Sequence, residues 1–387
     1  MFCGIKRGLD SLLDHYAAAC IALALFILSL VGVGDMVTVS LLGLLLCMVG
    51  LTRRSARVDL WILVPLLVYD LFCLVSSYAA YGNIADGYGV THAIFPLLCL
   101  LTACLDQGER RLLGRLCVLW VSVAAGAGIA GFVFQAVTQG RVGRMGGLLG
   151  NPNAMGIFLV LGWAIALDSG SFLEPLLLIG AAMTLSMGSF VAMAAGILVL
   201  LADKKRTASW GETVRYGCQL LAKASLGVGT GLLLYLSAAR TRVPWVCLLL
   251  AAYAGAVLVL WKDLGRFLEA KPRMAALIAA LGVLVALAAV LIRPSAVATF
   301  AERLEMMASG LHYLTADPLV GVGPFQWRLL DLHDGGKYFN TWHIHNVPLH
   351  VGVETGWIAM AALCLAGLRA LDRRNPLRAM TAAFLVH

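Results

Sequence analysis

The segment TWHIHNVPLHVGVETGW, from Thr341 to Trp357, decides how this chain is organised. It holds three of the chain's eight histidines together with an Asn and a Glu, and apolar sequence resumes directly after it. Polar groups at the end of a membrane helix are costly to desolvate, so such a cluster is by default a candidate functional site. We infer that the membrane helices hold this cluster, and several arginines, at the outer face of a bilayer.

The composition excludes a water-soluble protein. Of the 387 residues, 61% are hydrophobic and 13% are charged, whereas soluble proteins carry about 25% charged residues. Apolar runs that can cross a hydrocarbon core of ~30 Å recur along the chain. Only helices and closed barrels satisfy the backbone in lipid, so we predict one all-α, polytopic membrane domain over residues 1–387. The net charge of +8 lies mostly in short loops between spans, which indicates membrane topology rather than a nucleic-acid partner.

The apolar runs predict about 12–13 transmembrane helices. Basic residues mark every second loop, which places the N-terminus in the cytoplasm and residues 293–350 in one large extracytoplasmic loop. The chain stops at His387 inside an apolar run that begins near Ala379, so we expect a C-terminus truncated within a transmembrane segment. The other predicted spans are 17–34, 36–51, 59–79, 91–105, 113–137, 147–167, 171–187, 188–202, 217–237, 243–261, 274–292 and 351–371.

The large outer loop has its own pattern. Phe300, Leu304, Met307 and Leu311 have helical spacing, which predicts an amphipathic helix that lies on the membrane surface. The turn-rich segment from Ala316 to Pro324 follows it.

The ten cysteines lie at the N-terminus or in and beside apolar runs. They form no CxxC pair and have no metal-ligand spacing with histidine, so we interpret them as packing residues.

The sequence GGLLGNPNAMG, from Gly146 to Gly156, predicts the start of a helix at the outer face. Asn151 suits the position that caps a helix, and Pro152 suits the first helical position. The free N–H groups there carry partial positive charge and can bind an anion, with Arg144 close by. An ordinary capped helix start explains the same residues.

Seven arginines lie in predicted outer loops, against the charge bias that the inner loops follow. Arg pairs with phosphate oxygens through two parallel hydrogen bonds. A solvated loop or contact with anionic headgroups explains any one of them, but the set favours a diphosphate site. The seven are Arg141, Arg144, Arg240, Arg242, Arg293, Arg303 and Arg328.

The HIHN motif can supply a general base, because a neutral imidazole accepts a proton from an attacking hydroxyl near neutral pH. His343 and His345 share a side of the chain if the segment is extended and diverge if it is helical, so joint metal binding stays open. No nearby carboxylate or Cys completes a metal set. His350 and Glu354 lie one helical turn apart and can pair. The alternative for each histidine is a purely structural role.

Three motifs together resemble the bacterial O-antigen ligase/polymerase superfamily, whose members transfer glycans from undecaprenyl-diphosphate carriers outside the plasma membrane. The motifs are RMGGLLGNPNAMG from Arg144 to Gly156, ERLEMMASGLHYLTADPLVGVGPFQW from Glu302 to Trp327, and HIHNVPLHVGVETGW from His343 to Trp357. The resemblance implies a bacterial inner-membrane protein with a GT-C-like glycosyltransferase architecture. It also implies a metal-independent transferase without a cofactor, which uses a polyprenyl-diphosphate-linked glycan and an acceptor hydroxyl.

The resemblance also implies roles for particular residues. His345 is then the essential histidine, and Arg303 grips the carrier diphosphate. The further residues that we expect at the substrate are Arg144, Asn151, Asn153, Ser186, Arg240, Arg242, His343, Asn346 and Glu354.

One departure from the family pattern is the outer turn Ser186-Met187-Gly188, where the family carries Ser-Arg-Gly. Either Arg240, Arg242 or Arg144 replaces the missing cation, or the donor is atypical, or the chain is inactive. Ligase and repeat-unit polymerase fit the sequence equally. A transporter or flippase of lipid-linked glycans is the alternative from another class, and it predicts broken helices and ionisable groups at mid-membrane in two related halves.

Overall fold

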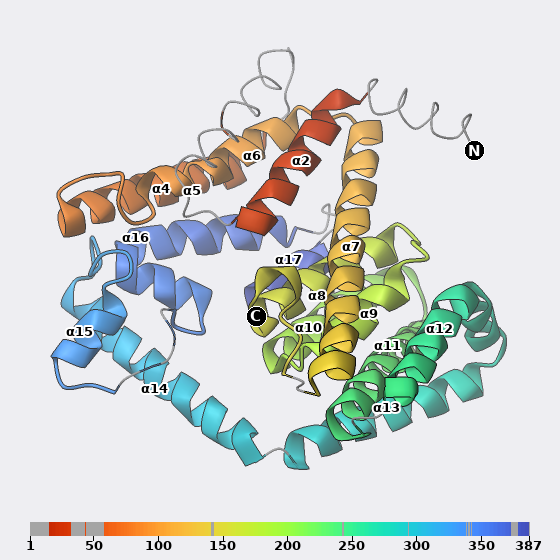
Figure 1. The fold of residues 1–387 in the computed structure, drawn as a ribbon. Coiled ribbons are helices and arrows are strands. Elements are labelled where there is room, and N and C mark those ends of the chain that lie inside the picture. The colour runs from red at the N-terminus through yellow and green to blue at the C-terminus, as the bar shows by residue number, and fades with distance from the viewer. Residues whose placement is uncertain are drawn as a thin grey trace. The chain divides into compact units, whose positions relative to one another are not determined.

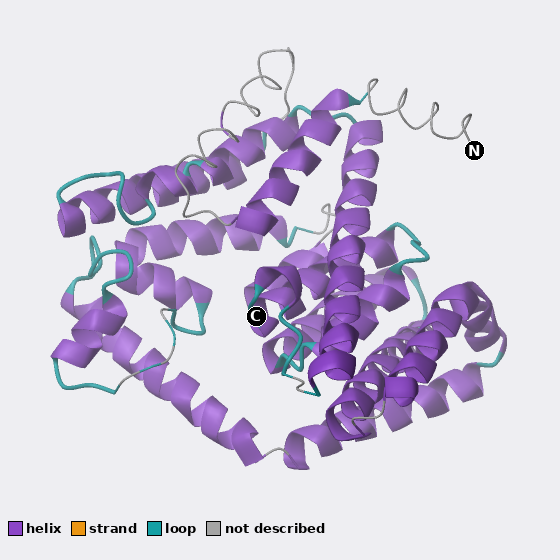
Figure 2. Ribbon diagram, viewed as in Figure 1, coloured by secondary structure: helices purple, strands orange, loops and turns teal. Residues whose placement is uncertain are grey.

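The computed structural model is built of helices and connecting loops, and the described residues contain no strand (Figure 2). These residues are 15–31, 43, 58–140, 143–241, 244–292, 294–337, 339, 341, 343–372 and 378–386. The predicted span 36–51 lies almost entirely outside them.

Six of the described helices are long and apolar enough to cross a membrane. They are α4 (Leu60–Tyr81), α7 (Gln107–Gln139), α10 (Met187–Thr207), α11 (Trp210–Thr241), α12 (Pro244–Ala270) and α16 (Val347–Ala370) (Figure 1). This finding supports the prediction of an all-α, multi-pass membrane protein, whereas the count of about 12–13 spans stays a prediction.

The other helices are shorter or less apolar. Apolar stretches occur in α2 (Tyr16–Val31), α6 (Ile94–Ala103), α8 (Pro152–Asp168), α9 (Glu174–Met183) and α13 (Pro272–Ile292). The remaining elements are α5 (Gly89–His92), the 3-10 turn η1 (Gly147–Leu149), α14 (Pro294–Ala316), α15 (Trp327–His333) and α17 (Arg378–Val386).

The helix predicted over 171–187 is shorter than expected. Its counterpart α9 has 10 residues, which extend about 15 Å, half the thickness of a hydrocarbon core. The helix ends where the Thr184 hydroxyl bonds back to the Ala181 carbonyl at 2.7 Å and Leu185 takes a positive φ of 50°. Ser186 then caps α10 by accepting from the Ser189 N–H at 3.4 Å. The two helices therefore meet at the predicted Ser186 turn.

The chain folds into two compact units. Unit 1 comprises residues 1–113 and 294–372, and unit 2 comprises residues 114–293 and 373–387. Neither unit is a continuous half of the sequence. The single domain over residues 1–387 stays a prediction.

Within unit 1, α14 packs against both α15 and α16, around a core that includes Met306, Tyr313, Trp327, Ile344 and Val353. The helix predicted from the outer-loop pattern is present as α14. Three of its four predicted apolar residues remain exposed, because Phe300, Leu304 and Leu311 are 63%, 50% and 53% exposed, whereas Met307 packs against the core. The exposed residues suit the membrane surface that the sequence predicts.

A break in α16 ties this helix to the turn that follows α14. Gly356 has φ 90° and ψ 170°, which interrupts the helix and frees carbonyls in the preceding turn. Backbone N–H groups of the turn fill the gap: Val322 donates to the Val353 carbonyl at 2.9 Å and Gly323 to the Glu354 carbonyl at 3.1 Å. Trp357 donates back to the Pro318 carbonyl at 2.8 Å.

Unit 2 is built around α8, whose buried side chains Met155, Leu159 and Trp163 pack against neighbouring helices. Glycines allow close helix approach there. A Cβ on Gly231 of α11 would lie 2.4 Å from the Ile179 carbonyl oxygen of α9.

A cysteine at residue 333 tests the predicted topology. The His333 side chain is 85% exposed, so His333→Cys should react with an impermeant maleimide in intact cells if 293–350 is extracytoplasmic. Arg266→Cys is the control, because the Arg266 side chain is 76% exposed and lies in a predicted inner loop. Labelling is read as mass added above the parent chain. Reaction of Arg266→Cys before lysis, or protection of His333→Cys until lysis, would contradict the predicted topology.

Replacing Gly356 tests the α16 break. An added Cβ would lie 2.1 Å from the Leu319 carbonyl oxygen, and alanine strongly disfavours this positive φ. Gly356→Ala should therefore destabilise the fold by about 2–5 kcal/mol, seen as a lower melting temperature in detergent. Gly255→Ala in α12 is the control, since a Cβ there meets nothing within 4 Å. Equal melting of the two variants would contradict the constraint.

Candidate functional site

The HIHN motif leads directly into α16. Asn346 is the cap of this helix, and its side chain accepts from the Leu349 N–H at 2.9 Å. Pro348 lies in the first helical turn, where its missing N–H costs nothing. The cap therefore fixes where the helix begins, and so places His350 and Glu354 on one side of it. Asn346, expected at the substrate, has this structural role.

Glu354 is fully buried, at 0% exposed. The Tyr88 hydroxyl donates to its Oε2, and the Phe325 N–H donates to its Oε1 at 2.9 Å. The Ser76 hydroxyl of α4 donates to its backbone carbonyl at 2.6 Å. Glu354 thus joins α4, the segment before α5, the turn after α14 and α16, which makes it a structural centre of unit 1 rather than a residue open to a ligand.

His350 and His343 extend this buried chain outward. The predicted pairing of His350 with Glu354 is present as a contact of 3.5 Å between Nε2 and Oε2. The same Nε2 lies 2.9 Å from Nδ1 of His343 and 3.3 Å from the Tyr88 hydroxyl. His350 is 9% exposed, whereas His343 is exposed. A line of polar groups therefore runs from the buried carboxylate to the surface.

His345 is also exposed and lies outside this chain. Partial burial, and then the charge of Arg303, lower its pKa, and His343 lowers it further. The Glu302 carboxylate opposes this effect by raising the pKa. Because its pKa is lowered, His345 is neutral at neutral pH and can accept a proton.

Arg303 lies in α14 and is half-buried. Its Nε is buried without a hydrogen-bond partner, and no carboxylate among the described residues pairs with its guanidinium. A buried N–H without a partner costs free energy, so an anionic ligand would stabilise this position. Arg303 thus lies within the electrostatic reach of His345.

A second group lies in unit 2 at the start of α8. Asn151 caps α8 by accepting from the Asn153 N–H at 2.8 Å, and Pro152 occupies the first turn. Arg144 donates from Nη2 to Asn153 Oδ1 at 2.7 Å and from Nε to the Thr184 carbonyl at 2.9 Å. The capped helix start is as predicted. Asn153 and the Thr184 carbonyl together orient the Arg144 side chain.

Gly156 brings the Ser186 turn close to this helix start. A Cβ on Gly156 would lie 2.4 Å from the Ser189 hydroxyl and 2.9 Å from the Ser186 Cβ. Arg144, Asn151, Asn153 and Ser186 therefore gather within unit 2. Arg240 falls in the last turn of α11, and Arg242 lies outside the described residues.

Sequence analysis missed Tyr88 and Phe325. Tyr88 stacks on His92 with ring centroids 4.6 Å apart, and Phe325 meets the Tyr88 ring edge-on at 5.0 Å. Gly87 before Tyr88 has a positive φ of 74°, so a glycine there could have indicated a turn. No sequence spacing, however, predicts that this loop contacts Glu354.

One group of side chains in the described part of the chain has the spacing of a metal site. Ligand atoms of His15, Asp106 and Glu109 lie within 4.8 Å of one another. Asp106 and Glu109 already form a helix-capping box, in which Asp106 Oδ1 accepts from the Glu109 N–H at 2.8 Å and Glu109 Oε2 accepts from the Asp106 N–H at 3.0 Å. The capping box accounts for this group.

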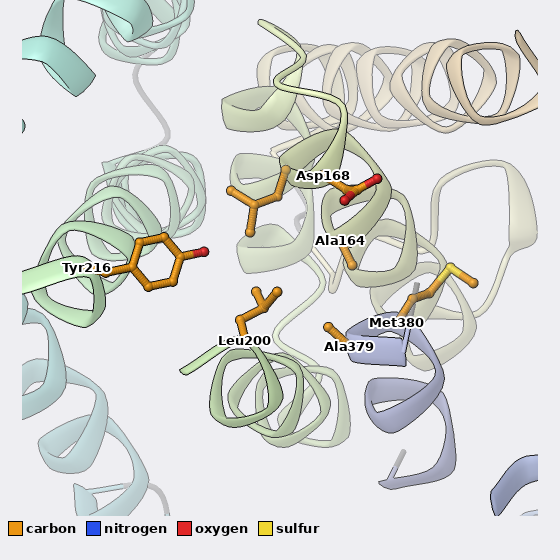
Figure 3. A pocket seen from close by; sticks show the side chains of 7 residues that line it. Ala164, Asp168, Leu200, Tyr216, Ala379 and Met380 are labelled. Atoms are coloured by element: carbon orange, nitrogen blue, oxygen red, sulfur yellow. The ribbon is translucent and has the colours of Figure 1, made fainter. Parts of the chain in front are cut away.

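Two cavities of unit 2 lie at the other end of α8 from Asn151. One has a volume of about 260 Å³ and is lined by residues that include Asp168, Leu200, Tyr216 and Met380 (Figure 3). The other, of about 310 Å³, lies beside Glu174 and Lys223. Seventeen-residue α8 extends about 25 Å, so neither cavity belongs to the Arg144 group.

Comparisons of the chain with protein-family models, with curated proteins and with solved structures find no match.

Removing the Arg303 charge tests its coupling to His345. Arg303→Gln should raise the pKa of His345, because the positive charge that disfavours the imidazolium is gone. The acid range in which His345 is protonated then extends to higher pH, as measured by NMR titration of labelled histidine. Arg328→Gln is the matched control, since Arg328 is not among the groups that shift His345. A pKa unchanged in Arg303→Gln would refute the coupling.

Proposed function

We propose that this chain is a membrane glycan transferase of the O-antigen ligase type, working at the outer face of a bacterial plasma membrane. The observation that carries the proposal is the pair His345 and Arg303. An exposed imidazole with a lowered pKa lies in the electrostatic field of an arginine whose buried Nε has no partner. A base within the electrostatic reach of an arginine suits a reaction in which a hydroxyl loses its proton and an anion leaves.

The donor in this proposal is a saccharide linked to a polyprenyl diphosphate. His345 accepts the proton of an acceptor hydroxyl, whose oxygen forms the new bond to the anomeric carbon. The bond from that carbon to the diphosphate oxygen breaks, and the electron pair leaves with the carrier diphosphate. Arg303 stabilises the negative charge that develops there. The reaction needs no cofactor in this scheme.

The turn Ser186-Met187-Gly188 of unit 2 lacks the cation that the resemblance implies, because Met187 cannot bind phosphate. Arg144 is the best-supported replacement within unit 2. It is exposed, and Asn153 and the Thr184 carbonyl hold it beside the free N–H groups at the start of α8. Arg240 and Arg242 remain the alternatives. The acceptor is a lipid, cell-wall or glycan hydroxyl, so a repeat-unit polymerase is the closest variant of this proposal.

A transporter or flippase of lipid-linked glycans is the second candidate. Two observations favour it: the break in α16 at Gly356 and the buried Glu174, which pairs with Lys223 at 2.7 Å. Transporters use the free carbonyls of broken helices to hold ions. Here the Val353 and Glu354 carbonyls are occupied by Val322, Gly323 and Ser76. The enzyme therefore remains the stronger proposal.

Replacing His345 tests the transferase. A general base contributes about 10²–10⁴-fold in rate, so His345→Ala should raise the barrier by about 3–5 kcal/mol and leave donor binding nearly intact. His343→Ala should reduce turnover less. The assay is transfer from a purified lipid-linked donor at matched protein levels. Near-normal turnover in His345→Ala, or a larger loss in His343→Ala, would show that His345 is not the base. Flipping of the lipid-linked glycan without transfer would favour the transporter.

A further inference from the structure

His343 is the outermost member of the buried polar chain, and its protonation follows from its partners. Burial and the Glu354 carboxylate raise the pKa of Tyr88. Tyr88 therefore keeps its proton and donates it to Glu354. The Tyr88 oxygen, having donated its hydrogen to Glu354, faces Nε2 of His350 as an acceptor at 3.3 Å, and a Glu354 carboxyl oxygen lies 3.5 Å from the same nitrogen.

The surroundings of the two ring nitrogens decide which nitrogen of His350 carries hydrogen. A bare Nε2 would face the lone pair of the Tyr88 oxygen and would place the hydrogen on Nδ1, which is buried without a partner. A hydrogen on Nε2 removes both penalties, because a buried N–H without an acceptor is rarer than a buried acceptor without a donor. A doubly protonated His350 also carries hydrogen on Nε2.

The Nε2–H of His350 then has His343 Nδ1 as its nearest acceptor, at 2.9 Å. Nδ1 of His343 must therefore be the bare nitrogen, and a neutral His343 carries its hydrogen on Nε2. A buried acid thus fixes a histidine tautomer, here through a second histidine.

We propose that His343 presents a fixed Nε2–H at the protein surface as a hydrogen-bond donor for phosphate oxygens, in contrast to the bare imidazole that His345 uses as a base. His343 influences the pKa of His345, as Arg303 does, so both groups lie within electrostatic reach of His345. Phosphate oxygens are strong acceptors, and they suit an exposed neutral donor in a segment that also feels the charge of Arg303, whose buried Nε has no partner. The assignment of these oxygens to a carrier diphosphate rests on the proposed function, whereas the tautomer does not.

The test is ¹⁵N NMR of the full chain labelled at histidine, in detergent free of phospholipid. Subtracting the spectrum of His343→Gln identifies the His343 signals. Protonated Nε2 and bare Nδ1 are expected, and Glu354→Gln should populate the other tautomer. A His343 protonated on Nδ1 in the wild-type chain would overturn the proposal. This measurement needs no substrate and no transfer activity.

Inorganic diphosphate is then added as the probe. It should shift the Nε2 signal, and binding should weaken about 10- to 100-fold in His343→Ala and His343→Asn, the loss expected for a hydrogen bond to a charged group. His343→Gln should keep most of the affinity, because its amide N–H can occupy the place of Nε2–H. Equal losses in all three variants, or no shift with diphosphate, would overturn the ligand assignment.

Nanodiscs of phosphatidylglycerol, without diphosphate, separate the two sources of phosphate oxygens. A shift in the nanodiscs but not with diphosphate would overturn the carrier assignment in favour of a lipid headgroup. If the tautomer and the diphosphate response are present but transfer is absent, the transferase proposal fails and the donor role of His343 stands.

Discussion

The burial of Glu354 is the constraint on which unit 1 depends. A carboxylate with no exposed surface is tolerated only if its oxygens are occupied by donors. Tyr88 and the Phe325 N–H supply those donors, and each comes from a different stretch of chain. Satisfying one side chain thus fixes the positions of two loops against α16. The Gly356 break and the turn after α14 form the backbone part of the same arrangement.

The helical content and the motif boundaries could be predicted from the sequence because their causes are local. Apolar length predicted long helices such as α4 and α7, and Asn151-Pro152 predicted the start of α8 from cap chemistry alone. The spacing of Phe300, Leu304 and Leu311 predicted α14. The pairing of His350 with Glu354 followed from one helical turn, whereas Arg303 and His345 were selected only by resemblance.

The remaining features depend on contacts between distant segments. Tyr88 and Glu354 are 266 positions apart in the sequence, and no periodic pattern in the sequence predicts a contact over that separation. The break at Gly356 looks like an ordinary glycine in an apolar run until the turn that fills it is seen. The shortness of α9 depends on the Leu185 backbone, which no propensity rule would predict. Local patterns in the sequence therefore suggest candidate residues, whereas the hydrogen bonds that hold these residues depend on the fold.

The two histidines of the HIHN motif differ because their neighbours differ. His343 meets buried acceptors through His350, which fixes its tautomer, whereas His345 meets the Arg303 charge, which keeps it neutral. Their separation of two residues in a non-helical segment allows each side chain to have its own surroundings. A helix starting earlier would turn the two side chains to nearly opposite faces and separate them. The Asn346 cap, by starting α16 after His345, therefore has a chemical consequence: it keeps the proposed base and the proposed donor in one exposed, non-helical segment.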